Sequence, residues 1–129
     1  YLKQESHLVG HIMSTELYTV NENDLANLAT ELMKWKNIHH MPVENSEGKL
    51  TGLLTWTHAQ KFQKQSSEKA NLTVADIMQP EIITVVPETH ITDAIRTMKK
   101  YEIGCLPVAH NNVLVGIITI KDVIAFDHE

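Results

Sequence analysis

The feature that most constrains this chain is an internal repeat. Shifted by 65 residues against itself, the sequence aligns without a gap from Val9 to Val43. The identical pairs are mostly apolar or conformationally restricted residues: Val9/Val74, Ile12/Ile77, Met13/Met78, Glu16/Glu81, Thr19/Thr84, Val20/Val85, Ala29/Ala94, Met33/Met98, Lys34/Lys99, Ile38/Ile103, Pro42/Pro107 and Val43/Val108. After one inserted residue near Glu47 the offset is 64, which matches Leu50/Leu114, Gly52/Gly116, Thr55/Thr119 and Phe62/Phe126. A match over most of the chain indicates a duplicated structural unit.

Both units are predicted to contain the same elements in the same order. In the first unit these are an apolar lead-in at 7–13, a β-rich stretch at 17–20, a helix, a strand from 41–43, a turn at 45–48, a strand at 50–56 and a helix from Thr57. In the second they are a lead-in at 74–78, a β-rich stretch at 82–86, a helix, a strand from 106–108, a turn at 110–112, a strand at 113–120 and a helix from Lys121.

The first long helix of each unit is predicted from apolar residues at helical spacing. The stripe is Leu25, Leu28, Ala29 and Leu32 in the first unit and Ile91, Ala94, Ile95 and Met98 in the second. Asp24 and Thr89 precede these stripes, where a side-chain oxygen can cap a helix N-terminus.

The repeat also predicts the domain organisation. We expect a first repeat at 7–65, a polar linker at 66–72 and a second repeat at 73–129. A unit of about 55–60 residues has little core of its own. The two sheets are therefore expected to pack together as one module covering 1–129.

Composition excludes several classes of function. The net charge of −5 argues against sequence-independent binding of nucleic acid, which needs a basic surface. No apolar run approaches the ~20 residues that span a bilayer. The single cysteine, Cys105, cannot form an internal disulfide, which favours a reducing, cytoplasmic location. The chain begins Tyr1-Leu2-Lys3, and we expect it to be a piece of a longer protein.

The second unit contains a recognisable series of motifs. They are Val74-Ala75-Asp76-Ile77-Met78, Thr84-Val85, Ala94 with Met98, Ile103-Gly104-Cys105-Leu106-Pro107-Val108, and Val115-Gly116-Ile117-Ile118-Thr119-Ile120-Lys121-Asp122-Val123. In this order, and duplicated, they make the chain resemble the cystathionine β-synthase (CBS) domain pair over nearly its whole length. The resemblance implies an α/β (α+β) fold of two βαββα repeats with pseudo-twofold symmetry and two clefts between them.

The resemblance also implies a regulatory role. Ligands of the family include AMP, ADP, ATP and S-adenosylmethionine, and some members bind nothing known. The usual role is control of an attached enzyme, transporter or channel, and two pairs often assemble as a homodimeric disk. No cofactor is required, and no nucleic acid or membrane span is implied for this segment.

In the family, a Thr or Ser and an Asp three residues later bind ribose hydroxyls where the last strand enters the last helix. Thr119 and Asp122 match this motif, and a carboxylate can accept two hydrogen bonds from a vicinal diol. The alternative is simple helix capping. The base is expected beside the first strand of the unit and a nearby proline, at Glu81, Ile82, Ile83, Thr84 and Pro107.

Phosphate is often met by basic residues just before the proline of the opposite repeat. Those positions are His39 and His40, which gain charge only when protonated. Lys121 is another candidate cation. The lone arginine, Arg96, is expected on the solvent face of its helix. A triphosphate is therefore served less well than AMP or S-adenosylmethionine.

The first unit departs from the motif. Thr55 is present, but His58 replaces the aspartate and Trp56 lies between them. A histidine is a poorer acceptor for a diol, so this degenerate cleft is expected to be empty or to bind something else. Its other candidate residues are Leu17 and Thr19 on one side, with Gly104 and Cys105 as the opposite wall.

Two alternatives belong to other classes. Eight histidines invite a metalloenzyme hypothesis, yet His39 and His40 are not an i,i+4 pair and no zinc motif is present. Cys105 has no acid–base partner nearby in sequence, so we expect no catalytic residue and no metal. The second alternative is an interaction module that binds no ligand and only dimerises its parent protein.

Overall fold

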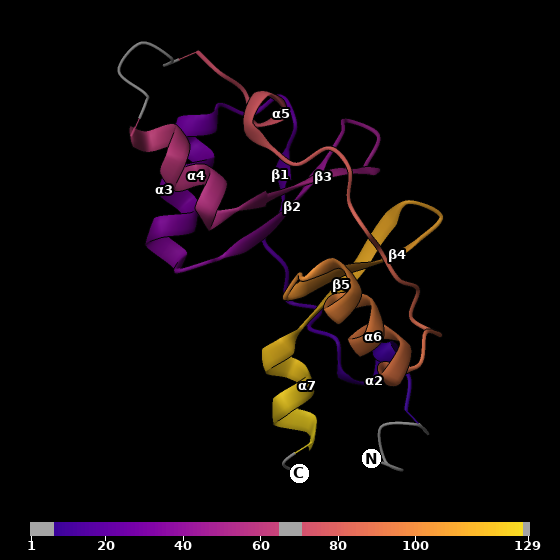
Figure 1. The fold of residues 1–129 in the computed structure, drawn as a ribbon. Helices are drawn as coiled ribbons and strands as arrows, with labels where there is room; N and C mark the ends of the chain where they lie inside the picture. Colours follow the sequence, from indigo (N-terminus) through magenta and orange to yellow (C-terminus); the bar gives the residue numbers. More distant parts are fainter. Residues whose placement is uncertain (1–6, 65–70, 128–129) are drawn as a thin grey trace. The chain divides into compact units, whose positions relative to one another are not determined.

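The structure is a computed structural model, and it describes residues 7–64 and 71–127. By contacts these residues divide into two compact units (Figure 1). From here on, the first unit means the compact unit Tyr18–Ile82 and no longer the first sequence repeat. The described residues up to Leu17, together with those from Ile83 onward, form the second unit. The expected linker at 66–72 falls almost entirely outside the described residues.

The first unit contains a three-stranded sheet with the order β1-β2-β3. In chain order its elements are β1 (Val20–Asn21), α3 (Ala26–Lys36), β2 (His40–Glu44), β3 (Leu50–Thr55), α4 (Trp56–Lys64) and α5 (Val74–Ile77). β1 is parallel to β2, and β2 is antiparallel to β3. The helices α4 and α5 both contact α3.

The second unit repeats this arrangement around a hairpin. Its elements are α2 (Val9–Ile12), α6 (Ile91–Tyr101), β4 (Cys105–His110), β5 (Val113–Thr119) and α7 (Ile120–Asp127). β4 and β5 are antiparallel. A single parallel bridge between Val85 and Val108 takes the place of β1. The fold is thus mixed α/β with two βαββα repeats, as the sequence predicts.

Each lead-in segment packs on the body of the other repeat. Ser14, from the start of the chain, exchanges two backbone hydrogen bonds with Ile117 of β5, at 2.8 and 3.0 Å. Gln79 exchanges the equivalent bonds with Leu53 of β3, at 2.8 and 3.0 Å. The compact units are therefore not the two halves of the sequence, because the repeats exchange their lead-ins reciprocally.

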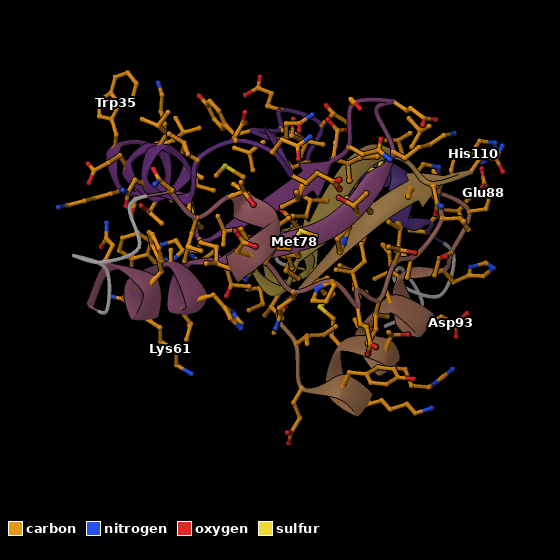
Figure 2. All side chains as sticks on the ribbon, turned by 90° about the horizontal axis from the view of Figure 1, so that it is seen from above. Trp35, Lys61, Met78, Glu88, Asp93 and His110 are labelled. Carbon is orange, nitrogen blue, oxygen red and sulfur yellow. The ribbon has the colours of Figure 1, made fainter. Side chains whose placement is uncertain are left out.

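The lead-ins complete the two hydrophobic cores. Val9 and Val74 are both 0% exposed, and each lies in the core cluster of the unit that its lead-in joins. Two glycines let the lead-ins approach the sheets. A Cβ on Gly52 would lie 2.8 Å from the backbone oxygen of Gln79 and against Met78, which Figure 2 places beside the strands. A Cβ on Gly116 would meet Met13 and lie 3.1 Å from the oxygen of Ser14.

The predicted helix caps are wrong by one residue. The N-caps of α3 and α6 are Leu25 and His90, with no side-chain cap hydrogen bond. Asp24 instead accepts the backbone N–H of Asn21 at 2.9 Å. Thr89 accepts that of Val86 at 3.2 Å. Both side chains close the turn that precedes the helix, a competing use of short polar residues.

Other boundaries differ in small ways. The final helices begin at Trp56 and Ile120, one residue before the expected starts, so the preceding strands end at Thr55 and Thr119. The predicted β-rich stretches are too long. Of the stretch expected at 17–20, only Val20 lies in a strand, β1 (Val20–Asn21), because pairing with β2 is confined to those two residues. No helix in the described ranges is long and apolar enough to cross a membrane.

Candidate functional site

The predicted Thr–Asp motif lies at the junction of β5 and α7. Thr119 is the last residue of β5, and α7 begins with Ile120. The backbone N–H and the hydroxyl of Thr119 both donate to Oδ2 of Asp122, at 2.9 and 3.1 Å. In return, the N–H of Asp122 donates to the Thr119 hydroxyl oxygen at 3.3 Å. The two side chains thus form a reciprocal cap at the start of α7.

The capping hydrogen bonds engage only one oxygen of the Asp122 carboxylate. The hydrogen bonds from Thr119 reach Oδ2, so Oδ1 is available to a further donor, since an ionised carboxylate can accept about four. Both side chains are partly exposed. The capping interpretation and the ligand interpretation are therefore compatible at this turn.

Cys105 lies directly opposite Thr119 in the β4–β5 hairpin. Its side chain is buried. Burial, and secondly the negative charge of Asp122, raises the pKa of the Cys105 thiol to about 12. The thiol is therefore neutral at physiological pH and acts as a small apolar wall. Next to it, the carbonyl of Gly104 accepts the N–H of Ile120 at 3.1 Å.

Three of the residues expected beside the base belong to the same unit as this turn. Val85 donates to the carbonyl of Pro107 at 3.1 Å, which brings the segment of Ile83 and Thr84 alongside β4. Ile83 packs against the core, Thr84 is exposed and Pro107 is buried. Ile82 belongs to the first unit.

The charged candidates near this turn are on the surface. Lys121 is exposed at the start of α7. Arg96 is on the solvent face of α6, as expected, and pairs with Asp93 at 2.8 Å. Neither residue is buried against the Thr119–Asp122 turn.

The first unit contains the same turn with different chemistry. The N–H of His58 donates to the hydroxyl oxygen of Thr55 at 3.3 Å, as in the other unit. The same hydroxyl lies 2.7 Å from Nδ1 of His58. His40 is opposite Thr55 in the β2–β3 hairpin, at the position that Cys105 has in the second unit. The carbonyl of His39 accepts the N–H of Trp56 at 2.9 Å.

The fold changes the pKa of His40. Partial burial lowers the pKa of its imidazole below the ordinary value, and the neighbouring charge of His39 lowers it further. Neutral His40 is therefore favoured in the folded protein.

The structure groups the candidate residues by unit. It brings Cys105 and Gly104 to the Thr119–Asp122 turn and brings His39 and His40 to the Thr55–His58 turn. Leu17 belongs to the second unit and Thr19 to the first. The pairing of His39 and His40 with Thr119 and Asp122, and of Gly104 and Cys105 with Thr55 and His58, stays a prediction.

An apolar groove between α6 and α7 was not predicted. It has a volume of about 350 Å³, and its walls include Ile95, Ile103, Ile120, Val123 and Ile124. Ile120 and Ile124 are 48% and 51% exposed. Their i,i+4 spacing at the start of α7 is the signal in the sequence that an apolar face extends to the surface.

The described histidines and acids are not arranged as a metal centre. Within residues 7–64 and 71–127, no group of three histidine, cysteine or carboxylate side chains is placed to hold a metal ion.

The comparison with known families settles what the repeat is. The CBS domain family matches residues 9–63 and 74–129. The chain belongs to the CBS domain family. It contains two CBS domains in tandem.

Two solved CBS pairs have the same fold over nearly the whole chain. The CBS domain pair of protein MJ0100, in complex with 5′-methylthioadenosine and S-adenosyl-L-methionine, is 28% identical, with a TM-score of 0.82 over 94% of this chain and 95% of that one. CBSX2 in complex with AMP is 25% identical, with a TM-score of 0.84 over 95% of this chain and 97% of that one.

A CBS pair also forms part of larger relatives. A homoserine O-acetyltransferase of Methanococcus vannielii is 31% identical over 117 residues, which are 90% of this chain. The match spans only 24% of that protein.

Proposed function

We propose that this CBS pair is a regulatory module that binds an adenosine-containing ligand at the Thr119–Asp122 turn. AMP, ADP, ATP and S-adenosylmethionine are the candidates. The observation that carries the proposal is the carboxylate of Asp122, held in place by Thr119 and partly exposed to solvent.

The chemistry of this turn suits a ribose. A fixed carboxylate accepts hydrogen bonds from a vicinal diol, and the hydroxyl of Thr119 lies beside it. The base would lie against Ile83, Thr84 and Pro107, with Ile82 as a further contact. The adenosine ligands of MJ0100 and CBSX2 support this ligand class.

The charges favour a ligand with few phosphates. Lys121 is the cation nearest in sequence to Asp122, while Arg96 already pairs with Asp93. His39 and His40 are the residues that the family resemblance assigns to phosphate, and this assignment predicts tighter binding near pH 6 than near pH 8. AMP and S-adenosylmethionine are therefore favoured over ATP.

Regulation would follow from a population shift. A ligand that binds one arrangement of the two repeats more tightly than another favours that arrangement, by as much as its affinities differ. The change would then reach the protein that the module controls. In this mechanism the CBS pair contributes no catalytic residue of its own.

The test is ligand-induced thermal stabilisation, measured with AMP, ADP, ATP and S-adenosylmethionine. A ligand present at 100 times its dissociation constant adds about 2.7 kcal/mol to the free energy of unfolding. Asp122→Ala should remove the ligand-dependent shift, whatever it does to the melting temperature without ligand. Asp93→Ala is the matched control, because Asp93 is an exposed aspartate of the same unit, which Figure 2 places at the surface.

Two results would reject this function. One is the absence of a shift with every ligand of the panel. The other is a shift that persists unchanged in Asp122→Ala.

A second candidate function is supported by the groove between α6 and α7. Half-exposed isoleucines beside a cavity of about 350 Å³ suit a protein partner, and a second copy of the module is the partner that the family resemblance implies. Ile124→Glu should then convert a dimer to a monomer in analytical ultracentrifugation. An unchanged mass would exclude this groove as the dimer interface.

A further inference from the structure

The five methionines of the chain differ in how far the fold protects them. Met33, Met41 and Met98 are buried, with exposed fractions of 1%, 0% and 4%. Met13 and Met78 are partly exposed, and they are equivalent positions of the repeat. The duplicated fold thus leaves one partly exposed thioether side chain in each unit, at the same place.

These two methionines end the lead-in helices. Met13 is the C-cap of α2 and Met78 is the C-cap of α5, and each donates its backbone N–H to a helix carbonyl at 2.9 Å. The next residue along the chain is the one that exchanges two backbone hydrogen bonds with a strand, at Ile117 and at Leu53. Each methionine therefore lies at the point where its lead-in joins the sheet.

The sulfur of each methionine lies against the backbone of the strand that its lead-in completes. A Cβ on Gly116 of β5 would contact Sδ of Met13 and lie 2.9 Å from its Cγ. A Cβ on Gly52 of β3 would contact Sδ of Met78 and lie 3.0 Å from its Cγ. The thioether thus occupies the space that a side chain on the strand would otherwise fill. An additional atom on the sulfur has little room on the strand side.

The adjoining backbone does not suit a sulfoxide oxygen. A sulfoxide is a polar hydrogen-bond acceptor, and burying it without a donor is unfavourable. In the second unit the N–H groups of Ser14 and Ile117 are already donated to each other's carbonyls. Those carbonyl oxygens are acceptors too, so they repel a further acceptor. Gln79 and Leu53 are paired in the same way in the first unit.

A displaced lead-in would open a hydrophobic core. Met13 and Met78 pack against the core clusters of their units, and each is preceded in its lead-in by a valine that is 0% exposed. Each lead-in meets its strand through an isolated bridge rather than a full ladder of hydrogen bonds. Side-chain packing therefore contributes much of the attachment, and a polar sulfur favours a loosened lead-in.

We propose that Met13 and Met78 form a paired oxidation switch, in which sulfoxide formation loosens each lead-in from the sheet that it completes. The oxidant is a peroxide. The thioether sulfur attacks one oxygen of hydrogen peroxide, an S–O bond forms as the O–O bond breaks, and proton transfer to the departing hydroxide releases water. The sulfur loses two electrons and the peroxide gains them. No ligand takes part, so the switch does not depend on the proposed function.

The first measurement is the order in which the methionines react. The protein is treated with increasing concentrations of hydrogen peroxide, and peptide mass spectrometry follows the addition of one oxygen atom to each methionine. Met13 and Met78 should be oxidised before the three buried methionines, because the fold shields the latter from the oxidant. Cys105 should react slowly, because burial raises the pKa of its thiol and the thiolate is the reactive form.

The second measurement is the effect of oxidation on the fold. Sulfoxide formation at the two partly exposed methionines should lower the melting temperature by about 4 °C or more. Amide hydrogen exchange at Ile117 and Leu53 should accelerate by about tenfold or more, because their N–H groups donate to the lead-ins. The amide of Ala109, which donates to Val85 within the second unit, is the matched control and should change less.

Leucine variants test whether these two sulfurs are responsible. The double variant Met13→Leu, Met78→Leu keeps apolar side chains of similar volume but cannot form a sulfoxide, so its melting temperature should not respond to peroxide. Met33→Leu is the matched control, because Met33 is buried, and it should respond as the wild type does. Methionine sulfoxide reductases A and B, one for each sulfoxide epimer, should restore the melting temperature of the oxidised wild type. This reversal needs no variant, so the proposal is tested even if the leucine protein does not fold.

Three outcomes would overturn the proposal. The first is oxidation of all five methionines at the same rate. The second is an unchanged melting temperature and unchanged amide exchange when both sulfoxides are present. The third is a response to peroxide that persists in the double leucine variant.

Discussion

At the scale of single residues, His40 shows how the fold changes the chemistry of a side chain. Partial burial and the adjacent charge of His39 both lower its pKa. A histidine whose pKa is lower in the folded state than in the unfolded state binds protons less readily when folded. Its contribution to stability is present above the unfolded value, about 6.5, and is lost as the pH falls through the folded pKa.

We therefore predict that His40 makes the protein less stable in mild acid. The free energy of unfolding, measured by urea denaturation at pH 7.5 and pH 5.5, should fall more in the wild type than in His40→Cys. His39→Asn should give an intermediate slope. Equal slopes in all three proteins would contradict the prediction.

The positions of the candidate site residues were predictable from the sequence, but their environment was not. The motif spacing places Thr119 and Asp122 at the junction of strand and helix, and the structure confirms that place. The repeat locates Thr55 and His58 in the same way. The 2.7 Å contact that orients His58, and the burial that shifts the pKa of His40, depend on side-chain packing. No periodicity in the sequence contains that information.

At the scale of elements, the helices show which sequence signals are reliable. Apolar spacing correctly predicts that α3 and α6 are helices, and it predicts the buried face of α6, which includes Ile91, Ala94 and Met98. The stripe predicted for α3 is wrong in part, because Leu25 and Leu28 are 42% and 66% exposed. The core-facing residues of α3 are Ala29, as predicted, and others such as Met33. The cap prediction fails because Asp24 and Thr89 can satisfy either a helix N-terminus or a preceding turn. Here the turn is used at both equivalent positions. Short polar residues thus indicate that a helix begins nearby, but they do not determine which residue is its N-cap.

The ends of these two helices provide a matched stability test. Asn37 and Glu102 are equivalent C-cap residues with φ of 55° and 53°, in the left-handed region. Asparagine tolerates that region better than glutamate, and a negative charge is unfavourable at a helix C-terminus. Glu102→Gly should therefore raise the free energy of unfolding by about 0.5–1 kcal/mol, and Asn37→Gly by less. Urea midpoints in the reverse order would show that the backbone strain is not the controlling effect.

At the scale of the whole molecule, the reciprocal exchange of lead-ins is the feature that the sequence alone did not predict. The apolar character of 7–13 and 74–78 is visible, but each segment could pack on either repeat, since the repeats are alike. The choice depends on long-range contacts such as Ser14 with Ile117 and Gln79 with Leu53. As a result, the chain passes from one compact unit to the other at Leu17 and again at Ile82.

This exchange predicts that neither sequence half folds alone. A fragment of 1–65 lacks Val74, and a fragment of 66–129 lacks Val9, although both side chains are 0% exposed in the intact protein. Each fragment also contains few residues for an independent core. We expect each fragment to show no cooperative thermal transition by circular dichroism. An equimolar mixture of the two fragments should show a cooperative transition, because each lead-in can then pack on the sheet of the other fragment.

Two substitutions in the second fragment test the cause of this recovery. Val74→Ser should weaken the complex by about 2 kcal/mol, since it removes buried methyl groups and leaves a cavity in the core of the first unit. Ala75→Ser is the control, because Ala75 is exposed one residue further along α5. A cooperative transition in either fragment alone would show that a repeat can complete its core with its own lead-in. Equal effects of the two substitutions would mean that Val74 does not hold the two fragments together.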